Sequence, residues 1–171
     1  MKAAKKMKVV SGIAPIPKGF HTVTTCLMFR GADRAIDFYK EAFGAEVLDR
    51  LTAPDGKSVV HAQVRIGNSF LFLGDEIPGM GSGAPEKYGG SPVSLHLYVE
   101  DVDSAFERAV SAGAKIVMPV ADMFWGDRYG KVADPFGYEW GLATRKEDLT
   151  PEEIRRGAEE FFRKQAEGGK G

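Results

Sequence analysis

Two stretches of the chain repeat one order of hydrophobic and polar positions. Residues 26–47 and 96–117 each pass from an alternating segment through a short turn into a segment with helical spacing, and then into a further alternating segment. Alternation with a period of two predicts a strand, whereas apolar residues three and four apart predict one face of a helix. The helical stripes are formed by Ala35, Ile36, Phe38, Tyr39, Ala42 and Phe43, and by Val102, Ala105, Phe106, Ala109 and Val110. Gly44 and Gly113 follow the stripes, and glycine at this place is typical of a helix C-terminus.

Further short strands are predicted after each helix. We expect them at 46–51, 59–66 and 70–73 in the first half, and at 115–118, 129–133 and 138–143 in the second half. Each half therefore has the order β-α-β-β-β. The predicted fold class is α+β, with two tandem βαβββ modules that form curved mixed sheets around a cleft, plus a C-terminal helix. Neither half is large enough to form a stable core comfortably by itself.

Composition marks the boundaries between these units. The predicted units are a flexible basic arm at 1–19, the first module at 20–77, a Gly/Pro-rich linker at 78–91, the second module at 92–147, and a C-terminal helix and tail at 148–171. The helix is predicted to begin with Thr150 as its cap, Pro151 at its first position and Glu153 at the capping-box position. Its apolar face is expected to pack on the body of the protein or on a second subunit.

Strand alternation divides the side chains of each sheet between two faces. The apolar positions, expected to lie beneath the helices, are Val23, Leu27, Phe29, Val60, Ala62, Val64, Ile66, Val93, Leu95, Leu97, Val99, Trp140 and Leu142. The alternate positions, expected to face a cleft, are Thr24, Cys26, Met28, His61, Gln63, Arg65, Ser94, His96, Tyr98, Glu139 and Gly141. A sheet with helices on one side and a half-polar opposite face is typical of a ligand cleft.

Composition and charge argue against several classes of function. A formal net charge of −1 provides no basic surface for nucleic acid, and no apolar run is long enough to span a membrane. The single cysteine, Cys26, excludes an internal disulfide framework and fits a reducing compartment, so a cytoplasmic location is predicted. No base is assigned to this thiol, which is interpreted as a small apolar side chain. The lysines of the arm, interpreted as a solvated tail, are Lys2, Lys5, Lys6 and Lys8.

Several motifs, taken in their order, resemble the vicinal oxygen chelate superfamily, which includes glyoxalase I, extradiol dioxygenases and bleomycin-resistance proteins. These motifs are AIDFYKEAFGAE in the first helix, and YVEDVDSAFERAVSAGAK and DPFGYEWGL in the second half. More narrowly, HAQVRIGNSFLFLGDE, GGSPVSLHLYVEDVD, FWGDRYG and TPEE are similar to the PhnB-like branch. The resemblance covers residues 15–156, nearly the whole chain, and implies the paired βαβββ fold.

The resemblance also implies where a metal ion would bind. Metal-dependent members hold a divalent ion with His or Gln near the start of each module's first strand and Glu near the end of its last, and such ligands suit Zn, Ni, Fe or Mn. In this sequence the corresponding residues are Thr24, Ser94, Gly141 and Leu71, or Phe72 if the register differs by one. None of them is a usual metal ligand, so no metal cofactor is predicted. His96 and Glu139 lie two positions from the expected ligands, and they leave open a relocated metal site or an acid–base pair.

Two main hypotheses about function follow. The favoured one is a small-molecule-binding protein that lacks the usual metal ligands, sequesters an aromatic or peptide-like compound and forms a homodimer. The alternative is a metal-dependent glyoxalase-type lyase or dioxygenase in which His96 and Glu139 are the candidate catalytic residues. A third hypothesis is that the cleft is vestigial and the protein acts through its interfaces.

The predicted ligand-binding residues combine stackable apolar side chains with a few polar groups. They are Thr24, Met28, His61, Gln63, Arg65, Phe72, Ser94, His96, Tyr98, Trp125, Arg128 and Tyr129, with Phe124 as a further apolar contact. The segment FWGDRYG is expected to lie over the mouth of the cleft in the second module. If Arg65 and Arg128 converge, an anionic ligand is also compatible with the site.

Overall fold

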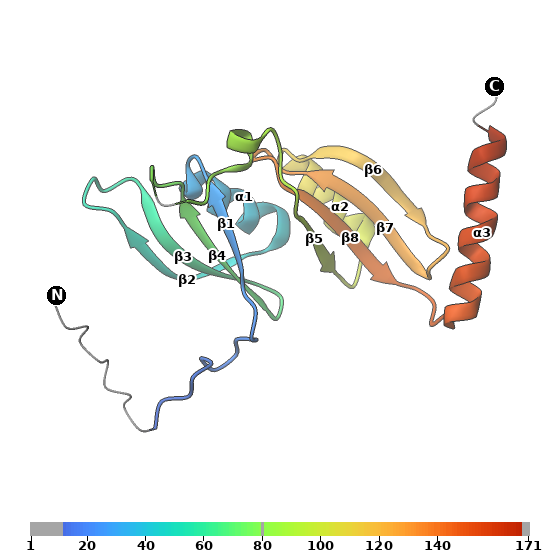
Figure 1. The fold of residues 1–171 in the computed structure, drawn as a ribbon, viewed down its shortest axis with the longest axis horizontal. Coiled ribbons are helices and arrows are strands. Elements are labelled where there is room, and N and C mark those ends of the chain that lie inside the picture. Colours follow the sequence, from blue (N-terminus) through green and yellow to red (C-terminus); the bar gives the residue numbers. More distant parts are fainter. Residues whose placement is uncertain (1–11, 80, 169–171) are drawn as a thin grey trace, which may run out of the picture.

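The computed structural model describes residues 12–79 and 81–168, and this part of the chain forms two similar modules followed by a helix (Figure 1). The first module consists of β1 (Thr25–Phe29), α1 (Ala32–Phe43), β2 (Glu46–Thr52), β3 (Val59–Ile66) and β4 (Ser69–Asp75). The second consists of β5 (Ser94–Tyr98), α2 (Val102–Ser111), β6 (Lys115–Asp122), β7 (Asp127–Ala133) and β8 (Glu139–Arg145). A last helix, α3, spans Pro151–Gly168. The predicted α+β class, the tandem βαβββ modules and the C-terminal helix are confirmed.

Each module contains one four-stranded mixed sheet. The strand orders are β1-β4-β3-β2 and β5-β8-β7-β6, and in both sheets the first strand runs parallel to the last strand while the other pairs are antiparallel. The first strand of each module is consequently an edge strand. Thr25 lies opposite Leu71 and Ser94 lies opposite Glu139, so residues that are far apart in the sequence become neighbours in the sheet.

The two main helices begin with different caps. Asp101 precedes α2, and its side chain accepts a hydrogen bond from the backbone N–H of Ser104, as is typical of an N-cap residue. Gly31 precedes α1 and has no side chain to offer, so the cap comes from the end of β4. Asp75 Oδ1 accepts hydrogen bonds of 2.8 Å from the backbone N–H groups of Gly31 and Ala32. The start of α1 is therefore fixed to the sheet that this helix covers.

The modules share one hydrophobic core rather than packing as separate bodies. A buried polar contact lies within this core, where the hydroxyl of Tyr39 in α1 donates a 2.7 Å hydrogen bond to Asp134 Oδ2 in the Asp-Pro-Phe-Gly turn of the second module. Trp140 Nε1 donates to the same oxygen at 3.1 Å. Burial raises the pKa of the Asp134 carboxyl, although these donors act in the opposite direction. This carboxylate joins the two modules together with other contacts, such as the 2.9 Å hydrogen bond from Arg108 Nε in α2 to the Ala42 carbonyl in α1.

Three apolar positions are more exposed than alternation predicts. Val23 and Val93 are 83% and 53% exposed because β1 and β5 begin only at Thr25 and Ser94, so both valines precede the sheet. Val60 is 41% exposed, whereas its neighbour Val59 is fully buried. A register shift between Leu51 and Thr52 on the paired strand β2 disturbs the alternation there. The prediction that these valines pack beneath the helices was wrong.

The linker between the two modules contains a short helix. Within residues 78–91 a short 3₁₀ helix, Pro85–Tyr88, follows the fully buried Ala84, whose N–H donates to Glu76 Oε2. The sequence predicted only a loop at this place. Of the predicted arm at 1–19, the lysine-rich residues 1–11 lie outside the described part of the chain.

The C-terminal helix begins with the capping box that the sequence predicts. Thr150 N and Thr150 Oγ1 donate to Glu153 Oε2 at 2.8 and 2.7 Å, and Glu153 N donates back to Thr150 Oγ1 at 3.3 Å. The helix contacts the body through Phe124, whose ring lies 5.4 Å from that of Phe161, measured between centroids. Its packing on the protein body was one of the two predicted arrangements. No helix within the described ranges combines the length and the apolar character that a membrane span requires.

Candidate functional site

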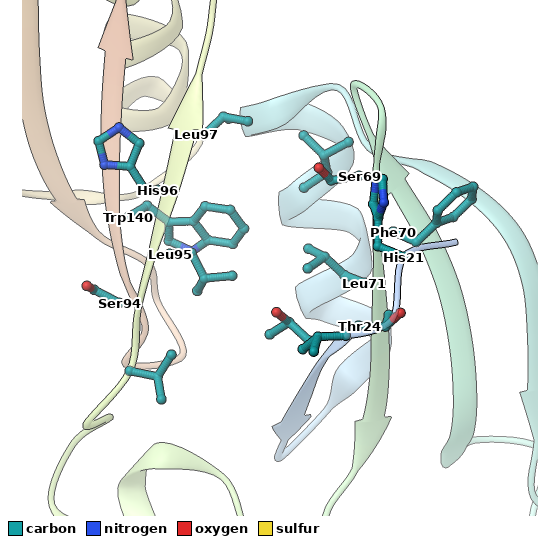
Figure 2. Close-up of a pocket in the computed structure, with 14 residues that line it drawn as sticks. His21, Thr24, Ser69, Phe70, Leu71, Ser94, Leu95, His96, Leu97 and Trp140 are labelled. Atoms are coloured by element: carbon teal, nitrogen blue, oxygen red, sulfur yellow. The ribbon is translucent and has the colours of Figure 1, made fainter. Parts of the chain in front are cut away.

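A cavity of about 330 Å³ lies between the two modules (Figure 2). One wall is formed by β5 and β8 of the second module, and the other by β4 and by the segment that leads into β1. Apolar side chains such as Leu71, Leu95, Leu97 and Trp140 line much of it. Small-molecule pockets in proteins have volumes of roughly 300–1,000 Å³, so a small ligand can enter without a large rearrangement.

A few polar residues border this cavity. Thr24 and His21 lie on the wall of the first module. Ser94 and His96 belong to β5 in the other wall, but Figure 2 shows their side chains on the side of this strand that faces away from the first module, whereas Leu95 and Leu97 point into the cavity. Thr24 and Ser94 are the two first-strand positions that the family resemblance identified, and the fold brings both to one cavity. His96 also belongs to an aromatic group, because its ring stacks on Tyr129 with centroids 5.7 Å apart. His21 was not predicted, since it precedes the alternating segment from which the candidates were read.

The residues at the family's metal positions do not fit a metal ion. Thr24 and Ser94 offer hydroxyl groups, Leu71 offers an alkyl group, and Gly141 has no side chain. The place of a side chain at position 141 is already taken, because a Cβ added to Gly141 would lie 2.7 Å from Cε2 and Oη of Tyr129. A carboxylate ligand there is incompatible with the position of this ring. Within residues 12–79 and 81–168, no group of three or more His, Cys, Asp or Glu side chains is placed to hold a metal ion.

The alternative pair, His96 and Glu139, is not joined by a hydrogen bond in the described residues. Glu139 lies opposite Ser94 in the sheet, and its Oε2 accepts a 2.9 Å hydrogen bond from Lys131 Nζ. This hydrogen bond raises the pKa of the Lys131 ammonium, which therefore stays protonated. Lys131 was not predicted as a site residue, because strand alternation gives the face of a side chain but not its partner on the neighbouring strand. The Glu139 carboxylate is therefore bonded to Lys131 of the same sheet and not to the His96 imidazole.

Several other candidates lie on the open face of the first sheet, not in the cavity. His61 packs against Phe72 with ring centroids 4.8 Å apart, and Gln63 is the strand neighbour of Phe72. Phe20, which the sequence did not single out, stacks at 4.4 Å on Phe70 and lies 5.7 Å from Phe72. The segment before β1 therefore covers part of this face.

Met28 and Cys26, both on β1, do not line the cavity between the modules. Met28 borders a separate depression formed with the linker, and its backbone N–H and C=O both bond to the hydroxyl of Tyr138. Cys26 is exposed, yet enough protein surrounds its thiol to raise the pKa of that group. A raised pKa lowers the fraction of thiolate at neutral pH, and this makes the thiol a weaker nucleophile.

The two arginines do not converge. Arg65 Nη2 donates at 2.6 Å to Glu46 of its own sheet. Arg128 donates at 2.7 Å to both carboxylate oxygens of Asp103 in α2, and a further bond of 3.1 Å reaches Asp122. These bonds hold the pKa of Arg128 well above its usual range. The arginines are engaged within different modules, so the expected anionic subsite is not formed by them.

The segment FWGDRYG forms the tight turn between β6 and β7 and does not border the inter-module cavity. Trp125 Nε1 and the hydroxyl of Tyr98 each donate a 3.0 Å hydrogen bond to Asp127 Oδ2. The bond to Asp127 raises the pKa of the Tyr98 hydroxyl. Phe124 points to α3, where it contacts Phe161. The predicted single cleft is therefore divided between the cavity, the open face of the first sheet, and a second pocket beside Trp125.

Comparisons with known proteins place the whole arrangement in context. The model of the Glyoxalase/Bleomycin resistance protein/Dioxygenase superfamily matches residues 20–142. The Mycobacterium tuberculosis protein Rv0887c is 46% identical over 132 residues, which cover 75% of this chain and 77% of the relative. The solved structure of the Arabidopsis thaliana product At5g48480 has a TM-score of 0.59 at 29% identity, covering 72% of this chain and 98% of that one. The PhnB protein from Bacillus cereus has the same fold, with a TM-score of 0.57 at 22% identity over 72% of this chain and 99% of that one.

Proposed function

Since this chain belongs to the glyoxalase/bleomycin resistance protein/dioxygenase superfamily and shares its fold with a PhnB protein, we propose that it binds a small organic molecule in the cavity between its modules. The observation that carries the proposal is a cavity of about 330 Å³ between the modules, whose mostly apolar lining includes Leu95 and Leu97 and also contains the polar Thr24. Such a lining buries apolar surface of a ligand, while the few polar groups fix its orientation.

The lining favours a flat aromatic or peptide-like ligand. Trp140 and Phe70 contribute aromatic surface to the lining. Aromatic side chains offer a large, flat apolar contact to a planar group. The hydroxyl group of Thr24 both donates and accepts hydrogen bonds, which suits amide or hydroxyl groups of such a ligand.

We propose that binding proceeds without a metal ion. The support is chemical, because the donor set at the family's metal positions consists of hydroxyl and alkyl groups, and because Tyr129 fills the space beside Gly141. Sequestration of a compound requires no metal, whereas the chemistry of a glyoxalase-type lyase or dioxygenase does. We therefore place the protein among the binding members of the superfamily.

We further propose that the protein acts as a homodimer in the cytoplasm. Exposed apolar side chains gather on β2 and β6, the strands farthest from the first strand of each sheet, and they include Leu48, Leu51 and Ile116. Apolar patches of this kind mark interfaces between proteins. Sedimentation velocity measures the mass in solution, and a monomer at all concentrations contradicts this part of the proposal.

The binding proposal is tested by filling the cavity. A screen of planar aromatic and dipeptide fragments by thermal shift is expected to yield compounds that raise the melting temperature of the wild type, because a ligand that binds only the folded state stabilises it. Leu95→Trp, at a side chain that points into the cavity, fills it with an indole and is expected to abolish these shifts. Ser111→Trp, on the exposed end of α2, is the matched control and is expected to retain them.

Two outcomes contradict the proposal. In the first, fragments stabilise the wild type and Leu95→Trp equally, which means that the ligand binds elsewhere. In the second, protein purified without chelator contains near-stoichiometric Ni, Zn, Fe or Mn that is lost in His96→Ala. That result favours the metal-dependent alternative over a binding protein without metal.

A further inference from the structure

A second pocket opens at the other end of the second sheet, between its strands and the start of α3. Its lining includes Tyr98 at the end of β5, Trp125 and Asp127 in the β6–β7 turn region, Arg145 at the end of β8, and Ile154 in α3. None of its lining residues borders the cavity between the modules. It is therefore a separate candidate site.

Two aromatic rings in this pocket are held by their polar edges. Trp125 Nε1 and the Tyr98 hydroxyl both donate to Asp127 Oδ2 at 3.0 Å. Trp125 is also packed edge to face against Phe124 and Tyr129, with centroids 4.9 and 5.7 Å away. These contacts favour one orientation of each ring, and Tyr98 still has 61% of its surface exposed. The pocket thus presents aromatic surface in a fixed position.

Two acidic residues, Asp127 and Glu100, lie beside these rings. Asp127 is only 6% exposed, and within the described residues Oδ2 accepts both of its side-chain hydrogen bonds, while Oδ1 has none. In those residues every fully buried side-chain nitrogen or oxygen has a hydrogen-bond partner. Because Oδ1 of Asp127 has no partner, it is not fully buried and is accessible to solvent. Glu100 adds a second acid to the lining. The cation of the lining, Arg145, is engaged by Asp148 and by the Glu147 carbonyl.

From this arrangement we propose that the pocket binds a small organic cation, a quaternary or protonated amine, on the faces of Trp125 and Tyr98. The ring faces carry negative electrostatic potential, and tryptophan has the strongest attraction for a cation among the aromatic side chains. The carboxylate of Asp127, at the polar edges of the two rings, supplies the countercharge. A purely apolar ligand uses only the ring surface, whereas a cation uses the ring surface and the carboxylate together.

The inference goes beyond the proposed function, because it concerns a second pocket and names a different class of ligand. The test uses choline as the probe and its uncharged isostere as the comparison, in which a tert-butyl group replaces the trimethylammonium group. The two molecules have nearly the same shape and hydroxyl group, so a difference in affinity reports the charge.

Binding is followed by NMR through the indole N–H signals of the protein's two tryptophans, Trp125 and Trp140. Choline is expected to shift the Trp125 signal and to leave that of the core residue Trp140 unchanged. The isostere is expected to bind roughly three- to thirty-fold more weakly at the same ionic strength. Trp125→Leu is expected to abolish choline binding. In this variant, which lacks the indole signal, binding is followed through the backbone signals around Tyr98. Phe162→Leu changes an exposed aromatic residue outside the pocket and is the matched control.

Asp127→Asn separates the role of the charge from that of the rings. The amide oxygen can still accept from Trp125 and Tyr98, so this variant is expected to bind both probes with similar affinity. Equal affinity of the wild type for choline and its isostere, no choline-induced shift at Trp125, or undiminished choline binding by Trp125→Leu each overturns the proposal. Leu95→Trp, which blocks the other cavity, is expected to bind choline normally, so the two proposals fail independently.

Discussion

The contact between Tyr39 and Asp134 is expected to determine how firmly the two modules hold together. Tyr39→Phe removes the hydroxyl that donates at 2.7 Å to Asp134 and leaves the fully buried ring in place. A hydrogen bond to a charged group contributes about 1.5–3 kcal/mol to stability, so the variant is expected to lose roughly that amount. Asp134 keeps its bonds from Trp140, Phe136 and Tyr138, and complete unfolding is therefore not expected.

The magnitude converts into a measurable change in melting temperature. For a chain of this size, 1 kcal/mol corresponds to about 2–4 °C, so the expected fall is roughly 3–12 °C. Urea denaturation followed by tryptophan fluorescence gives the free energy of unfolding directly, since Trp140 lies at the same contact. Tyr88→Phe is the matched control, because the Tyr88 hydroxyl bonds a carbonyl at the exposed surface. Equal stabilities of the two variants refute the argument.

The same contact gives the loss of stability a pH dependence. Burial raises the pKa of Asp134, so the folded protein binds this proton more readily than the unfolded chain does. The contribution of Asp134 to the free energy of unfolding therefore falls as the pH rises from the ordinary carboxyl pKa through the raised one, and it is constant above. Loss of the Tyr39 hydroxyl raises this pKa further. The deficit of Tyr39→Phe is consequently expected to be largest at neutral pH and to shrink in acid, and a deficit that grows in acid contradicts this reasoning.

Two further predictions concern single positions. Gly141→Ala places a methyl group against the Tyr129 ring and is expected to cost about 1–3 kcal/mol in urea denaturation, because overpacking strains the sheet. Tyr129→Ala is expected to relieve this cost in the double variant, and strict additivity of the two changes argues against the contact. Thr150→Ala is expected to remove about 1 kcal/mol from α3 by loss of its cap, seen as faster amide exchange in this helix alone. Unchanged exchange in α3 contradicts a stabilising capping box.

Local patterns in the sequence were sufficient for the elements and their order. The helical stripe around Ile36 and Tyr39, the glycine at position 44 and the Thr150–Glu153 pair are each read within a few residues, and each is found in the structure. Strand alternation also assigned most side chains to the correct face. It failed at Val23, Val60 and Val93, where the start of a strand or a register shift decided the exposure.

The site depended on contacts that no local pattern contains. Sequence alone gave Thr24, Ser94 and His96 as residues of one face, but it could not show that Tyr129 covers Gly141 or that Lys131 engages Glu139. Arg128 was expected near a ligand, yet it bonds Asp103, which is 25 residues away on a helix.

The physical reason is the same in each case. Alternation fixes the face from which a side chain emerges, because successive residues of a strand point to opposite sides. The neighbour that it meets there depends on strand register, on the packing of the helices and on the joining of the modules. By itself, the sequence determined a pair of βαβββ modules with a half-polar face and without the family's usual metal ligands. Only the tertiary structure divided that face into a cavity between the modules and a separate aromatic pocket beside Asp127.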